Sequence, residues 1–171
     1  MSAKGKKVLI VIAHNNFRDE EYTACRKAIE DNGGKVVVAS TVTENALGSQ
    51  GLVVNPDLFI DDVSADDFDG VVFIGGTGAS QFWHDVVAHD IAKTLLANDK
   101  VVAASSHSPV TLAVAGVLRG KKATGHVTIY EKLQVAGAEY TAKKLEQDGK
   151  IITACGVNAA KEFALAINAT L

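Results

Sequence analysis

The chain has 171 residues, enough for one domain with a sizeable core, and 47% of them are hydrophobic, which excludes a disordered chain. The formal net charge of -3 gives no electrostatic reason to expect a nucleic-acid partner, and no apolar run approaches the roughly 20 residues of a membrane span. The first residues lack the apolar segment of a secretory signal, and Cys25 and Cys155 form no metal or redox spacing. We therefore expect one domain over residues 1–171, located in the cytoplasm, with no membrane partner.

Strand and helix patterns alternate from the start of the chain. Residues 7–13 are continuously apolar after a lysine and rich in β-branched side chains, which is typical of a parallel strand covered on both faces. Residues 18–32 carry acids in their first turn and an apolar stripe, and Gly33 and Gly34 follow, so we expect a helix there. A second buried strand over residues 35–40 completes a right-handed βαβ unit.

The middle of the chain is less regular. Residues 48–60 predict short strands and turns in an antiparallel excursion, and Ser64 is expected to cap one helical turn. A buried strand is expected over 70–74, a helix over 80–98 and a central strand over 101–104.

The last third continues the alternation. A helix is expected after Pro109 as far as Leu118 and another near residues 130–135, followed by strands over 139–145 and 151–154 with a turn at 147–150 between them, and by a closing helix over 158–171. The fold class that follows is α/β: a flavodoxin-like three-layer sandwich with a mostly parallel central sheet and helices on both faces.

The central strand leads into the sequence Ser-Ser-His-Ser-Pro and then into a helix. A buried strand that enters a helix through a tight turn projects the turn residue above the sheet, as in a nucleophile elbow. Ala104 and Ser108 are the small neighbours that such a turn needs on either side of Ser106, and Pro109 suits a first helical turn. The alternative is that these serines only cap the helix, since the Gly-x-Ser-x-Gly pattern is absent.

Gly75-Gly76-Thr77-Gly78 follows the neighbouring strand. The loop could cradle phosphate, although the lysine of a P-loop is missing, or it could be only a tight turn. With an elbow nearby, we favour a third interpretation, in which backbone N–H groups approach a developing oxyanion.

Several motifs together resemble the ThiJ/PfpI superfamily, which includes the parkinsonism-associated deglycase, glyoxalase-type enzymes and archaeal intracellular proteases. The motifs occur in the family's order along nearly the whole chain. They are Phe17-Arg18-Asp19-Glu20-Glu21, Ile74-Gly75-Gly76, Ala104-Ser105-Ser106-His107-Ser108-Pro109, Ala115-Gly116-Val117-Leu118-Arg119-Gly120-Lys121, Ala136-Gly137-Ala138-Glu139-Tyr140 and Asp148-Gly149-Lys150-Ile151-Ile152-Thr153.

The resemblance implies a nucleophile at position 106, a carboxyl partner in Glu21 that hydrogen-bonds it, and an oxyanion site at Gly75, Gly76 and the His107 amide. The family nucleophile is a cysteine, and position 106 holds serine. Ser106 is either native or an engineered replacement, and the sequence leaves both open. A serine requires a general base, for which His107 and His126 are the candidates.

Two other departures from the family pattern are Ser108, where glycine is usual, and Cys155, where arginine is usual. The first functional hypothesis is an enzyme acting on a small reactive carbonyl or its adduct (glyoxalase or deglycase type), weakened or inactive as Ser106, with an intracellular peptidase as the alternative enzyme. A non-catalytic, stress- or chaperone-like protein is the alternative from another class.

A class I glutamine amidotransferase fits poorly, because no histidine lies between Cys155 and Glu162. We expect no cofactor and no metal, since His84 and His89 lack the spacing of a helical zinc motif. The resemblance also implies a homodimer or a larger homo-oligomer.

Overall fold

The computed structural model describes residues 3–171 and has the expected α/β architecture around a seven-stranded sheet. The strand order is β11-β12-β8-β7-β1-β3-β6, and every pair is parallel except β11 with β12. The strands are β1 (Lys7–Val11), β3 (Lys35–Ser40), β6 (Leu58–Phe59), β7 (Gly70–Phe73), β8 (Val101–Ser105), β11 (Leu145–Asp148) and β12 (Ile151–Ala154).

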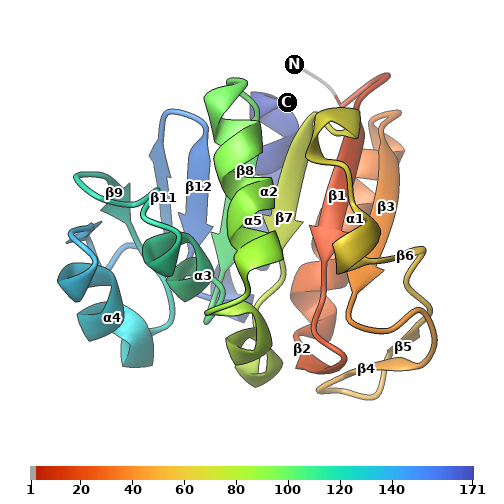
Figure 1. The fold of residues 1–171 in the computed structure, drawn as a ribbon, viewed down its shortest axis with the longest axis horizontal. Coiled ribbons are helices and arrows are strands. Elements are labelled where there is room, and N and C mark those ends of the chain that lie inside the picture. The colour runs from red at the N-terminus through yellow and green to blue at the C-terminus, as the bar shows by residue number, and fades with distance from the viewer. Residues whose placement is uncertain (1–2) are drawn as a thin grey trace.

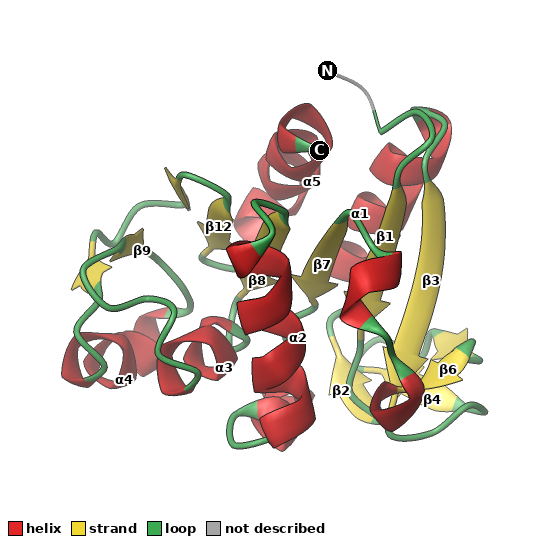
Figure 2. Cartoon of the chain, turned by 45° about the horizontal axis from the view of Figure 1, so that its top comes forward, coloured by secondary structure: helices red, strands yellow, loops and turns green. Residues whose placement is uncertain are grey.

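Helices cover both faces of this sheet, which gives the three layers. α1 (Asp19–Asp31) and α5 (Ala160–Thr170) pack against each other on one face, while α2 (Val86–Ala97) and α3 (Pro109–Val114) lie on the other (Figures 1 and 2). All residues of β7 and β8 are buried, as the continuous apolar runs predict for strands covered on both sides. The carboxyl ends of β1, β7, β8 and β12 therefore open onto one edge of the sheet.

Two small sheets flank the main one. β2 (Asn15–Phe17), β4 (Ala46–Gly48) and β5 (Val53–Val54) form one near the carboxyl end of β1, and β9 (Lys122–Ala123) pairs with β10 (Glu139–Tyr140) near α4 (Tyr130–Val135) (Figure 1). The Asp19 carboxylate holds the first of these against α1, because it accepts hydrogen bonds from the Gln50 and Leu52 amides at 3.1 and 2.9 Å. The expected antiparallel excursion is confirmed in the β4–β5 pair.

Three expected element boundaries and one expected helix cap are wrong. Residues 77–82 form a 3₁₀ segment, and α2 starts only at Val86, because the Asp85 carboxylate caps it by accepting from the Ala88 amide. The expected strand over 139–145 splits into β10 and β11, and α3 ends at Val114 rather than continuing to 118. Ser64 precedes a 3₁₀ turn without a side-chain capping bond. None of the helices within residues 3–171 is both long and apolar enough to cross a bilayer.

Candidate active site

Ser106 stands on a strained turn between β8 and α3. Its φ is +58°, in the left-handed region that non-glycine residues rarely adopt, and its amide donates to the Ala154 carbonyl at 3.0 Å. The Ser108 hydroxyl donates to the Ile74 carbonyl at 2.7 Å and so ties the turn to the end of β7, and Ser108 does not cap α3 with its side chain. The elbow is confirmed in its backbone geometry, and the capping interpretation of Ser108 is wrong.

The elbow opens into a cleft of about 370 Å³, a size suited to a small molecule. Five of the six expected site residues line it, namely Glu21, Gly76, Ser106, His107 and His126, and Gly75 does not. The rest of the wall comes from Arg18, Thr77, Cys155, Gly156, Val157 and Asn158.

Glu21 projects from the first turn of α1 and is fully buried. Its Oε2 accepts a hydrogen bond from the Ser105 hydroxyl at 2.6 Å and another from the Gly75 amide at 2.9 Å, whereas its Oε1 has no hydrogen-bond partner within residues 3–171. The expected hydrogen bond from Glu21 to Ser106 is therefore not formed, because the preceding serine takes the carboxyl group. The Gly75 amide is engaged in the same way, which leaves the Gly76 and His107 amides as the expected oxyanion donors.

Burial raises the pKa of Glu21, and the hydrogen bonds from Ser105 and Gly75 oppose that rise only in part. The direction agrees with the expectation from desolvation. In the protonated form, Oε2 accepts from two donors, so the proton is carried by Oε1 of this cleft-lining residue.

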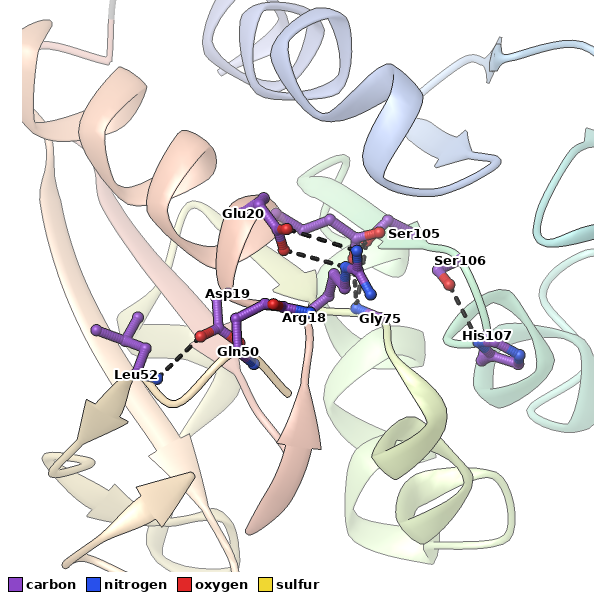
Figure 3. A network of polar contacts seen from close by, with 10 residues as sticks. Arg18, Asp19, Glu20, Gln50, Leu52, Gly75, Ser105, Ser106 and His107 are labelled. Atoms are coloured by element: carbon purple, nitrogen blue, oxygen red, sulfur yellow. Dashed lines mark hydrogen bonds and ion pairs between the residues drawn. The ribbon is translucent and has the colours of Figure 1, made fainter. Parts of the chain in front are cut away.

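The Ser106 hydroxyl pairs with its neighbour in the chain. Ser106 Oγ lies 3.0 Å from His107 Nδ1, as Figure 3 shows, and the His107 ring stacks on the His126 ring with centroids 4.5 Å apart and planes at 19°. The Trp83 indole N–H donates to the His107 carbonyl at 2.9 Å, which fixes the backbone of the base.

Thr128 contacts both imidazoles. Its amide donates to His126 Nδ1 at 3.2 Å, so that nitrogen is an acceptor, and the Thr128 hydroxyl donates to it at 2.7 Å. The Thr128 oxygen can then accept from His107 Nε2–H, at a long 3.5 Å. With its proton on Nε2, His107 presents an unprotonated Nδ1 to the Ser106 hydroxyl.

The pKa of His107 is lowered, first by burial and second by the nearby His126. A lowered pKa keeps the imidazole neutral at pH 7, which is the state a general base requires. His107 therefore has the position and the protonation state to take a proton from Ser106.

Arg18 brings a positive charge to the cleft wall. Its side chain is about one-third exposed, and its Nε lies 3.0 Å from Glu20 Oε2, so the charge is partly balanced (Figure 3). Sequence reasoning did not single out Arg18, Ser105 or Thr128 as site residues. The position of Ser105 next to the elbow was a usable signal, whereas nothing local marks Thr128.

Among residues 3–171, no cluster of three or more His, Cys, Asp or Glu side chains is arranged to hold a metal ion. His89, a residue considered for metal binding, is buried with its Nε2 2.9 Å from the Trp83 carbonyl oxygen. The side chains that line the cleft include hydroxyl, thiol, imidazole and carboxyl groups.

Comparison with known proteins agrees with the fold. The sequence pattern of the DJ-1/PfpI family matches residues 6–170. A protein of Thermococcus kodakarensis named as a deglycase is 36% identical over 147 residues, which cover 86% of this chain and 88% of that protein. The crystal structure of a ThiJ/PfpI domain protein from Brachyspira murdochii has 34% identity and a TM-score of 0.94, covering 98% of this chain and 96% of the other. Drosophila melanogaster DJ-1β has 29% identity and a TM-score of 0.87, covering 98% and 89%.

Proposed function

Because the chain belongs to the DJ-1/PfpI family, we propose that it acts on small reactive carbonyl compounds, or on adducts derived from them, through nucleophilic attack by Ser106. The relative named as a deglycase supports this class of substrate, and the size of the cleft suits it.

One observation carries the proposal: the Ser106 hydroxyl, held on a strained turn, lies 3.0 Å from His107 Nδ1. That distance is within reach for general-base catalysis, and a pair of nucleophile and base oriented by a third group is the recurring arrangement of activated hydroxyls. Thr128 orients the base here through His107 Nε2 and His126 Nδ1.

In the proposed step, Ser106 Oγ forms a bond to the carbonyl carbon while His107 Nδ1 takes the hydroxyl proton. The electron pair of the C=O bond moves to the oxygen, which the Gly76 and His107 amides face and stabilise. Glu21, protonated on Oε1, donates to the same oxygen. With methylglyoxal, the carbon-bound proton of the resulting hemiacetal then moves to the neighbouring carbon by way of an enediol, and water cleaves the ester that this leaves, which releases lactate and returns the hydroxyl of Ser106. With an adduct, the departing group takes the proton held by His107.

The proposed activity is slow. A cysteine is partly ionised near neutral pH and a serine is not, so Ser106 depends wholly on His107 for its deprotonation. The Ser105 hydroxyl cannot substitute, since it is buried and donates to Glu21.

The test measures methylglyoxal consumption by the protein as it stands and by Ser106→Ala and His107→Ala. Slow turnover that both substitutions abolish is expected, while turnover that survives Ser106→Ala would contradict the proposal. No turnover in any form would favour the non-catalytic alternative, and release of peptides from a casein substrate in place of methylglyoxal consumption would favour the peptidase.

A further inference from the structure

A second nucleophilic side chain lies beside Ser106. Cys155 is the first residue after β12, and Ala154, which precedes it, pairs with Ser105 across the β12–β8 ladder. The Ser106 amide donates to the Ala154 carbonyl at 3.0 Å, so the two chains stay paired at this point. Ser106 follows β8 as Cys155 follows β12, and neighbouring strands lie about 4.8 Å apart. Both residues line the cleft, and the Cys155 amide is fixed by a 2.9 Å bond to the Lys144 carbonyl.

The cleft also contains a polar atom without a partner. Glu21 lines the cleft, and its Oε1 is buried and has no hydrogen-bond partner among the described residues, although the other oxygen of the same carboxyl group has two. A buried polar atom left in this state points to a ligand group that completes it. A Cβ on Gly156, the residue after Cys155, would lie 3.9 Å from both Glu21 Oε1 and Ser106 Oγ, so this segment of the chain passes close to both groups.

The two thiols of the chain differ in what can reach them. Cys25 is completely buried on α1, and burial raises its pKa, so it is closed to reagents in the folded protein. Cys155 is partly exposed on the cleft wall. Thiols are a few per cent ionised at neutral pH and are intrinsically strong nucleophiles, whereas a hydroxyl needs a well-placed base.

We propose that Cys155 is a second nucleophile of this cleft, whose thiol captures small aldehydes, α-oxoaldehydes above all, as hemithioacetals. The inference rests on the proposed function for its class of ligand, but it places the covalent bond on a different residue. The Cys155 sulfur forms a bond to the aldehyde carbon, and the C=O electron pair moves to oxygen. That oxygen takes a proton from Glu21 Oε1 or from water, and the proton lost by the thiol returns to the donor, so the addition is balanced and reversible.

The experiment follows alkylation of each cysteine by iodoacetamide, using peptide mass spectrometry on the folded chain. Cys155 should be alkylated much faster than Cys25, which serves as an internal control for unfolding. Methylglyoxal at a concentration that occupies about nine sites in ten should slow alkylation of Cys155 about tenfold, by mass action. The slowing should disappear after dilution, and propane-1,2-diol, which has the same carbon skeleton without a carbonyl, should have no effect.

Ser106→Ala separates this proposal from the proposed function. Reversible protection of Cys155 that persists in Ser106→Ala, with or without methylglyoxal turnover in the unsubstituted protein, supports capture by the thiol. Turnover that depends on Ser106 while methylglyoxal leaves Cys155 alkylation unchanged would overturn the Cys155 proposal and leave the proposed function standing. Equal alkylation of the two cysteines, protection by the diol, or protection that dilution does not reverse would also overturn it.

Discussion

The hydroxyl of Ser105 lies 2.6 Å from Glu21 Oε2, and this contact joins the central strand to the first helix beneath the nucleophile. Ser105 precedes the elbow residue and is buried, so it donates to the carboxyl group that the family resemblance assigned to the nucleophile. The contact determines which oxygen of Glu21 is left without a hydrogen bond among the described residues.

Ser105→Ala should raise the pKa of Glu21 further, because the hydrogen bond from Ser105 favours the charged carboxylate and its loss removes that support. The measurement is an NMR titration of the labelled Glu21 carboxyl carbon. Ser105→Thr keeps the hydroxyl in a strand, where β-branched residues are well tolerated, and should restore the original titration. An unchanged midpoint in Ser105→Ala would contradict the hydrogen bond.

Glu21→Gln should change how stability depends on pH. The folded pKa of Glu21 is raised, so between the ordinary carboxyl value of about 4.3 and the folded value the native state holds a proton that the unfolded state has lost. Unfolding free energy therefore falls as pH rises through that window, by up to about 1.4 kcal/mol per pH unit.

Glutamine is neutral at every pH. The unfolding free energy of Glu21→Gln, measured with urea, should therefore lack the fall with rising pH that Glu21 causes. Glu20→Gln, a change to a neighbouring carboxyl on the outside of α1, is the matched control and should keep it. Equal slopes for Glu21→Gln and the unsubstituted protein would show that Glu21 ionises normally in the folded state.

Thr128→Val should reduce Ser106-dependent methylglyoxal turnover by about fivefold, the effect of losing one hydrogen bond of about 1 kcal/mol that orients the base. Because the pKa of His107 is lowered, activity should hold as pH falls to about 6.5 and decline only below that. Thr128→Val should shift the pH at which activity declines as well as lower the rate. Thr141→Val, outside the cleft, is the control, and equal rates and pH profiles for the two variants would show that Thr128 does not position His107.

Gly75→Ala should destabilise the fold by roughly 1–3 kcal/mol, the usual cost of overpacking. A Cβ at this position would lie 2.7 Å from Glu21 Oε2 and closer still to Ser106 Cβ, so the strand end and the elbow would have to separate. Thermal unfolding measures the loss. Gly149→Ala is a control for glycine substitution in open space, although its positive φ adds some strain of its own. A change at Gly75 no larger than the change at Gly149 would contradict the close packing.

The strands and the elbow could be predicted because their signals are local. The expected strand over 35–40 matches β3 residue for residue, and a buried run followed by small residues marked the turn at Ser106. What could not be predicted depends on contacts between distant segments. The partner of Glu21 was placed one residue off, because residues 105 and 106 are both serines and only the packing of α1 against β8 decides between them. Thr128 contacts the rings of His107 and His126, which only the fold brings together, and no spacing along the sequence predicts this contact.

The last prediction concerns the serine at position 106. Ser106→Cys should raise methylglyoxal turnover by at least about tenfold, because a thiol near neutral pH is partly ionised without the help of His107, whereas the hydroxyl depends on it. The cysteine form should therefore also be less sensitive to His107→Ala than the serine form, in which losing the general base costs roughly 10²–10⁴-fold. The assay compares serine and cysteine at position 106, each with His107 and with His107→Ala. All four forms carry Cys155→Ala, which removes the other thiol of the cleft. Equal turnover in the serine and cysteine forms would show that residue 106 does not attack the substrate, and equal dependence on His107 would show that ionisation of the nucleophile does not limit the rate.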